Sequence, residues 1–147
     1  MAGRPRKKAA GSKKVKPSGP VPCAVLWGLD PSSEKGAAVR AVLREMGVVA
    51  RTVARERLGD PAGAFARMPG VRQAPAPYDG PDPACDEFVL LCGLTNKQVD
   101  EFLARSREAG CTVGTKALLT KVNRAWPLVR LMQAVAVEHA QMGAGDA

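Results

Sequence analysis

The chain has 147 residues, with 22 Lys and Arg against 14 Asp and Glu, and a net charge of +8. This length fits one domain of ordinary size. Hydrophobic residues make up 46% of the chain, which is enough for a packed core and excludes a wholly disordered protein. The apolar runs are too short for a membrane helix, and no apolar stretch follows the basic start as it would in a secretory signal. We therefore expect a cytoplasmic protein with no membrane partner.

The positive charge is concentrated at the N-terminus. Residues 1–20 contain no acidic residue and seven basic ones: Arg4, Arg6, Lys7, Lys8, Lys13, Lys14 and Lys16. Because these seven account for most of the +8, residues 21–147 carry only +1. A segment so poor in apolar surface is expected to be a disordered tail. Its cations would neutralise phosphates and give nonspecific, salt-sensitive contact with nucleic acid. The alternative is a solubilising tail without a partner.

Two stretches of the body are alike. Each contains an apolar run, a Gly-Leu pair, a helical segment, a second glycine and another apolar run. The glycines of the first copy are Gly28 and Gly47, and those of the second are Gly93 and Gly110. Strands are predicted at residues 23–27, 48–49, 88–92 and 111–113. This pattern predicts two βαβ units.

Local signals mark the helices. Asp30 or Ser32 can cap the first helix, and Thr95 with Gln98 three residues later forms a capping-box pattern for the second. Pro127 suits the first turn of a C-terminal helix. Apolar residues at helical spacing occur in the first helix at Val39, Val42, Leu43 and Met46, and in the last at Leu128, Leu131, Met132 and Val135.

Two βαβ units in about 100 residues favour an α+β class, specifically a ferredoxin-like four-stranded sheet with a C-terminal helix. In that arrangement the first and third strands are central, and either the C-terminal helix or a dimer partner covers the open sheet face. The alternative is a doubly wound parallel α/β sheet, if a short helix at residues 61–68 is a crossover. We place a single domain at residues 21–142, with a Pro-rich loop at 69–86 and a disordered tail at 143–147.

The second half resembles a family of uncharacterised bacterial proteins classed as a domain of unknown function. The resemblance is strongest over residues 87–139. It rests on Glu87-Phe88, Gly93, Asp100-Glu101-Phe102-Leu103, Lys116-Ala117, Leu119-Thr120, Asn123, Trp126 and Glu138-His139. The family usually has a Ser or Thr helix cap after the tryptophan, where this chain has Pro127. The resemblance implies a bacterial cytosolic protein and brings no known reaction.

The densest polar cluster follows the last predicted strand. Together with the turn after the third strand, it forms a candidate anion or partner site of five residues: Thr95, Lys116, Thr120, Asn123 and Trp126. A lysine beside helix-start amides can bind an anion. The alternative interpretation is structural, with Thr120 and Asn123 satisfying turn backbone and Trp126 filling the core.

The sequence predicts no catalytic residue, metal site or cofactor. The only histidine is His139, and the four cysteines contain no Cys-x-x-Cys pair. Cys23 and Cys92 fall in predicted strands and should be buried, whereas Cys85 lies in the loop and should be the exposed thiol. We therefore predict a non-catalytic binding or regulatory module whose basic tail contacts nucleic acid. The alternatives are a self-associating interaction domain that uses the sheet face, or a small enzyme or anion-binding protein that uses residues 116–126.

Overall fold

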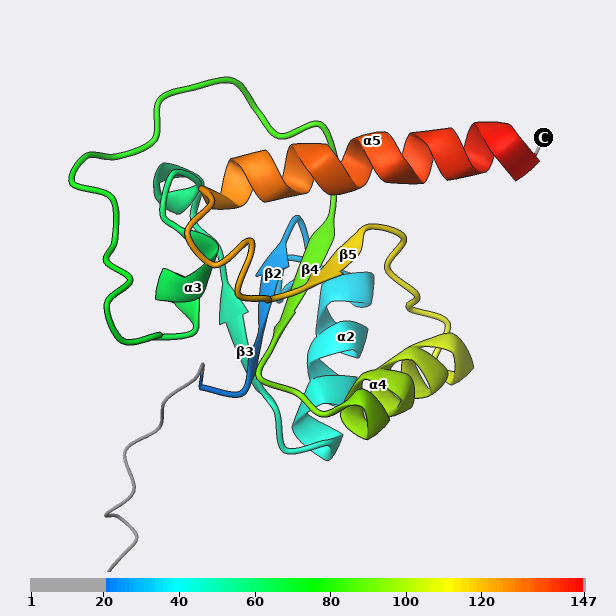
Figure 1. The fold of residues 1–147 in the computed structure, drawn as a ribbon. Coiled ribbons are helices and arrows are strands. Elements are labelled where there is room, and N and C mark those ends of the chain that lie inside the picture. The colour runs from blue at the N-terminus through cyan, green and yellow to red at the C-terminus, as the bar shows by residue number, and fades with distance from the viewer. Residues whose placement is uncertain (1–20, 147) are drawn as a thin grey trace, which may run out of the picture.

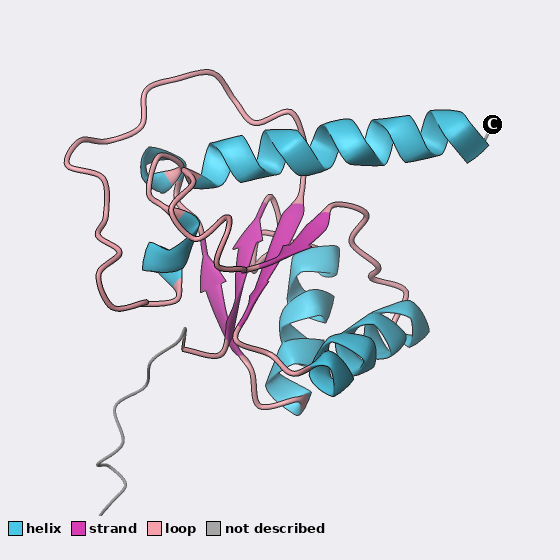
Figure 2. Cartoon of the chain, in the orientation of Figure 1, coloured by secondary structure: helices cyan, strands magenta, loops and turns pink. Residues whose placement is uncertain are grey.

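The computed structural model describes residues 21–146, which form one four-stranded mixed sheet with helices on both faces (Figures 1 and 2). The seven basic residues of the predicted tail lie outside the described residues. The elements in chain order are β2 (Cys23–Trp27), α2 (Glu34–Glu45), β3 (Val49–Thr52), the 3-10 helix η1 (Arg55–Arg57), α3 (Ala62–Phe65), β4 (Phe88–Cys92), α4 (Asn96–Glu108), β5 (Lys116–Leu118) and α5 (Leu128–Asp146). The predicted α+β class is confirmed.

The strand order is β3-β2-β4-β5. As predicted, the first and third strands are central. β2 pairs with β3 in parallel and β4 pairs with β5 in parallel, while β2 and β4 run antiparallel, with Cys23 opposite Cys92. The ferredoxin-like arrangement is not confirmed, because its split βαβ units place a strand of one unit between the two strands of the other. The fully parallel alternative is wrong, because the two central strands are antiparallel.

The two βαβ units place their helices on the same face of the sheet. α2 and α4 lie side by side beneath it, and α5 crosses the opposite face (Figure 1). This layout follows from right-handed crossovers. The two central strands are antiparallel, and each unit places its second strand on the outer side of its first, so both crossover helices lie on the same face of the sheet. The long connection between β3 and β4 follows from the same topology, because the chain must return from the edge of the sheet past β2.

Each face of the sheet has its own core. Ala24, Leu26, Val89 and Leu91 face α2 and α4, whereas Val25, Phe88 and Leu90 face α5. Leu128, Leu131 and Met132 of α5 are buried against that second face. Of the two predicted covers for this sheet face, the C-terminal helix or a dimer partner, the structure therefore has the C-terminal helix.

Local capping explains where the helices of the two units start. Ser33 caps α2, since its hydroxyl accepts a hydrogen bond from the Gly36 amide at 3.0 Å. The predicted cap, Asp30 or Ser32, is wrong by a few residues, because the Asp30 carboxylate instead accepts hydrogen bonds from Ser32. The capping box of Thr95 and Gln98 on α4 is confirmed.

The last strand differs from its prediction. Residues 111–113 form no strand, although Cys111 and Val113 are buried as apolar plugs beneath the sheet. The strand forms five residues further on, as β5, so Lys116 lies within a strand and not after it. At the other end of the chain, α5 continues to Asp146, past the boundary placed at residue 142.

The segment 69–86 contains no helix or strand, in agreement with the predicted loop, and α3 lies within the predicted helix at 61–68. Among residues 21–146, no helix is both long and apolar enough to span a bilayer.

Candidate functional site

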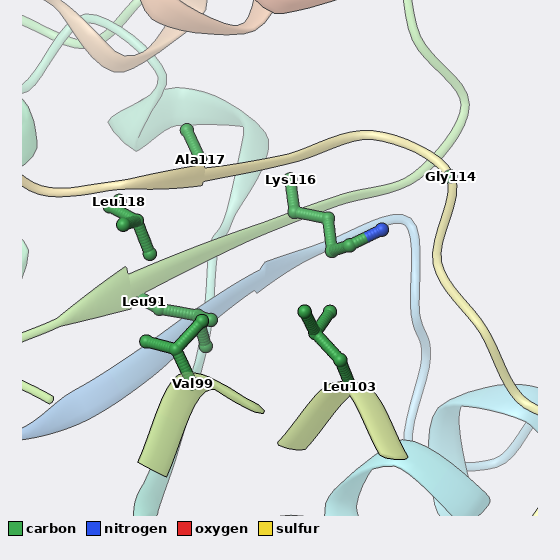
Figure 3. Close-up of a pocket in the computed structure, with 7 residues that line it drawn as sticks. All are labelled: Leu91, Val99, Leu103, Gly114, Lys116, Ala117 and Leu118. Atoms are coloured by element: carbon green, nitrogen blue, oxygen red, sulfur yellow. The ribbon is translucent and has the colours of Figure 1, made fainter. Parts of the chain in front are cut away.

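An open groove lies between the edge strand β5 and helix α4 (Figure 3). Its volume is about 230 Å³, which is smaller than the roughly 300–1,000 Å³ typical of small-molecule sites. The lining is apolar except for one lysine, and consists of Leu91, Val99, Leu103, Gly114, Lys116, Ala117 and Leu118. Leu118 is 46% exposed, and Val122 in the following turn is 75% exposed. The groove therefore offers an apolar surface with a single cation.

The outer edge of β5 is free to pair with another strand. The ladder to β4 uses the Thr115 carbonyl, which accepts from the Val89 amide at 3.1 Å, and the Leu119 amide, which donates to the Leu91 carbonyl at 2.9 Å. Because backbone groups alternate in direction along a strand, Lys116 and Leu118 point their amides and carbonyls away from β4. The Leu118 carbonyl accepts a hydrogen bond from the Asn123 side chain, and no other described group bonds these outward amides and carbonyls. An unpaired edge thus runs beside the apolar groove.

Lys116 lies along this groove with its ammonium group near Leu103 and Gly114 (Figure 3). The ammonium donates to the Val113 carbonyl and forms no ion pair with any described carboxylate. Burial lowers the pKa of Lys116. The opposite charge of an incoming carboxylate would favour the charged form of this ammonium and so offset the effect of burial.

Two of the other predicted site residues form a turn just after β5. The Asn123 side chain accepts from the Thr120 amide at 2.8 Å, and the Thr120 hydroxyl accepts from the Asn123 amide at 3.2 Å. Asn123 is only 9% exposed, and its amide group also holds the end of β5. These contacts make Thr120 and Asn123 a brace for the edge strand.

Thr95 and Trp126 are not brought to the groove. Thr95 caps α4, and Trp126 packs against the core beneath α5, with the Arg130 guanidinium 4.5 Å from its ring centroid. Of the five residues expected to form one site, the structure therefore places only Lys116 in a concave surface. The Thr120–Asn123 brace lies next to it along the chain.

A second surface collects positive charge where the described chain begins. The Val21 amide donates to the Ala66 carbonyl at 2.8 Å, and the Gly63 amide donates to the Arg124 carbonyl at 2.8 Å. These contacts join the start of the chain, the α3 segment and the turn after β5 (Figure 1). We call the four cations of these segments and of the adjacent β3 the basic end: Arg51, Arg67, Lys121 and Arg124.

The basic end carries no compensating carboxylate. None of its four side chains forms an ion pair within residues 21–140, and Arg67, Lys121 and Arg124 are exposed. The Nε atom of Arg51 is buried without a hydrogen-bond partner. This surface was not predicted from the sequence, although the sequence contains one signal for it: no acidic residue occurs between Glu108 and Glu138.

Two thiols meet beside this surface. Cys23 and Cys92 are both fully buried, as predicted, and lie opposite each other in the central strand pair. A hydrogen bond with Cys92 and the nearby guanidinium of Arg51, helped by the charge of Arg67, lower the pKa of Cys23 to about 7 against the opposing effect of burial. The same pairing, together with burial, raises the pKa of Cys92.

Cys85 is not the exposed thiol that its loop position suggested. It is 9% exposed and belongs to the core between the sheet and α5, and burial raises its pKa. The loop therefore folds back onto the body at this point. No group of three potential metal ligands occurs among residues 21–146.

The comparison with protein families agrees with the second half of this fold. Residues 87–142 match a domain of unknown function, DUF3783. The match takes in β4, α4, β5 and most of α5, and so includes both the groove and the brace after β5. It agrees with the resemblance found over residues 87–139 and carries no characterised activity. No curated protein and no solved structure matches the chain.

Proposed function

We propose that this protein is a non-catalytic binding module of the bacterial cytoplasm that contacts nucleic acid without sequence preference. Contact is made by the seven cations of residues 1–20 together with the basic end of the body. The observation that carries the proposal is the position of the basic end: its unpaired cations lie at the point where the highly basic segment joins the body. We infer from this that both groups of charge contact the same nucleic acid.

The electrostatics predict a steep dependence on salt. Each neutralised phosphate contributes roughly −0.9 to the slope of log affinity against log salt on duplex DNA. Seven contacts from residues 1–20 would give a slope of up to roughly −6, and three more from the exposed cations of the basic end, Arg67, Lys121 and Arg124, would bring it to roughly −9.

The cytoplasmic location in this proposal is supported by the cysteines. Cys23, Cys85, Cys92 and Cys111 are free thiols, as is usual in a reducing compartment.

The test is binding of the full chain to duplex DNA and to single-stranded RNA over a salt series. One variant replaces the seven N-terminal cations with Gln. A second carries Arg67→Gln, Lys121→Gln and Arg124→Gln, and a matched control carries Arg44→Gln, Lys97→Gln and Arg107→Gln, which remove the same charge from exposed positions on α2 and α4.

We expect the sevenfold variant to lose most of the affinity. The basic-end variant should have a slope shallower by about 2.7, whereas the control should keep the slope of the unmodified chain. Absence of binding by the full chain at low salt would overturn the proposal. If the basic-end variant and the control changed the salt slope equally, the basic end would have no specific part in binding, and only residues 1–20 would contact the nucleic acid.

A further inference from the structure

The β5 edge combines three features that together describe a ligand. It has outward-facing backbone groups on Lys116 and Leu118, an apolar groove beside them, and one ammonium group without a carboxylate partner among the described residues. We propose that this edge binds an extended peptide segment of a partner protein, which adds a fifth strand to the sheet. Its alternate apolar side chains enter the groove, and its carboxylate approaches Lys116. This site adds a protein partner to the proposed binding role and does not depend on nucleic-acid contact.

Backbone pairing supplies the first part of the recognition. The Lys116 amide and carbonyl and the Leu118 amide are free to bond a new strand. The Leu118 carbonyl already accepts a hydrogen bond from the Asn123 side chain. The brace after β5 therefore limits how far a peptide can pair beyond Leu118. Main-chain hydrogen bonds of this kind give affinity in strand addition, while pockets for alternate side chains give specificity.

The groove supplies the second part. On the side of β5 that faces α4, the Lys116 and Leu118 side chains extend toward Val99 and Leu103, whereas Ala117 points to the other face of the sheet (Figure 3). A strand added outside β5 would direct every second side chain toward α4 in the same way. Half-buried Val99 and Leu103 would then pack against those side chains, which favours an alternating apolar pattern in the peptide.

The charge of Lys116 selects the occupant. Because the ammonium is partly desolvated and bonded only to the Val113 carbonyl, a peptide carboxylate has a cation to meet in the groove. A second copy of this chain paired edge to edge would bring another Lys116 and no carboxylate to the same place. Residues 1–20 are also a poor occupant, because they carry seven cations and no acid.

The opposite edge of the sheet provides a comparison within the same molecule. β3 is also an edge strand, and its Val49 is 53% exposed. There the Arg40 side chain of α2 donates to the Thr52 hydroxyl and to the Leu29 carbonyl, and so closes the gap between helix and strand. Val49, an exposed apolar residue of this other edge strand, therefore serves as a control for Leu118 that lies away from the groove.

The experiment selects a random peptide library against the full chain in which the seven N-terminal cations are replaced with Gln. This bait prevents acidic peptides from being retained by residues 1–20, so failure here and failure of nucleic-acid binding are separate results. We expect selected peptides to have apolar residues at alternate positions and an Asp, Glu or free C-terminal carboxylate. A synthetic peptide of the selected sequence is then measured against variants by fluorescence anisotropy.

Leu118→Asp should weaken this peptide by at least about tenfold, which corresponds to about 1.4 kcal/mol, while Val49→Asp should leave its affinity within about twofold. Lys116→Glu should reverse the preference from acidic to basic peptides, and N-methylation of alternate peptide amides should abolish binding. Circular dichroism confirms that each variant is folded. Equal losses for Leu118→Asp and Val49→Asp, indifference to N-methylation, or no selection of peptides over background would overturn the proposal. So would a dimer in sedimentation that Leu118→Asp dissociates, because the occupant would then be a second copy.

Discussion

The two βαβ units of this protein are built alike but treat their outer edges differently. In the first unit, Arg40 spans from α2 to the edge strand β3. In the second, the corresponding position is Leu103, since Arg40 and Leu103 each stand seven residues before the glycine that follows their helix. Leu103 lines an open groove, and its hydrocarbon side chain has no donor for a hydrogen bond to β5. The presence of an arginine at this helix position beside β3, and of a leucine beside β5, thus distinguishes the closed edge from the open one.

The connections after the helices reinforce this difference. β3 begins two residues after Gly47, whereas β5 begins six residues after Gly110. Cys111 and Val113 use the extra length to plug the core beneath the sheet. The longer connection leaves β5 only three residues long, and the groove lies between this short strand and α4. Duplicated architecture therefore does not imply duplicated function.

The largest expected effect is at the joint between the units. Gly28 has φ +73°, and a Cβ there would lie 1.8 Å from the Asp86 carbonyl oxygen, just before β4. Gly28→Ala should cost about 2–5 kcal/mol, because left-handed backbone strain adds to a clash with main chain. Gly47→Ala, with the same φ but open space around its Cβ, should cost only about 1–2 kcal/mol. Urea unfolding of both variants measures the difference, and equal losses would contradict this account of the joint.

The next effect concerns pH and the central strand pair. Cys23 has a folded pKa of about 7, while a thiol in the unfolded chain titrates near 8.5. Between these values the unfolded state binds more protons, so stability should rise with pH by up to about 2 kcal/mol. Above that window the raised pKa of Cys92 opposes further gain, because the unfolded Cys92 thiol ionises first.

Urea midpoints of the wild type and of Cys23→Ser across this range test the titration of Cys23. The wild type should gain stability as the pH rises and the variant should not. A parallel pH dependence in the two proteins would show that Cys23 does not ionise in this window.

The edges themselves can be exchanged. Arg40→Leu should cost about 1–2 kcal/mol, because it leaves the Leu29 carbonyl without its charged donor at a half-buried position. Leu103→Arg should cost less than about 1 kcal/mol, since this side chain is only half-buried, but it should fill the groove. Thermal unfolding and the peptide assay together measure both effects. Full peptide binding by Leu103→Arg would show that the groove is not the site.

The last effect is also small and lies in the core beside α4. Ser106 occupies the position equivalent to Leu43, is 2% exposed, and its hydroxyl has no hydrogen-bond partner among the described residues. Ser106→Ala should raise the free energy of unfolding by about 1 kcal/mol, because a desolvated hydroxyl is removed. Differential scanning calorimetry would detect the higher Tm, and a lower Tm would indicate a buried partner for this hydroxyl.

Features set by neighbouring residues were predictable from the sequence. The capping box at Thr95, the left-handed glycines after both helices and the two buried central strands all follow from short-range patterns. The strand order was not predictable in this way, because interleaved and adjacent βαβ units share the same central strands and the same sequence of elements. That choice depends on how the long segment from β3 to β4 crosses the sheet.

Long-range packing also explains the errors at the candidate site. The run at 111–113 is apolar because it plugs the core, and that pattern resembles a strand. Cys85 is buried only because the loop returns to the body beneath α5. Lys116 was identified as a functional candidate from its polar neighbours, yet its position in the structure is an apolar groove that those neighbours do not line. The sequence pattern therefore indicated the region around Lys116 correctly, but it predicted a polar site where the structure has an apolar groove.

The measurement that tests the proposed function most directly is an amide-resolved NMR titration of the full chain with duplex DNA at low salt. We expect shifts in residues 1–20 and around Arg51, Arg67, Lys121 and Arg124, with no change along the groove at Val99 and Leu103. Unchanged spectra, or shifts centred on the α2 and α4 surface, would contradict it.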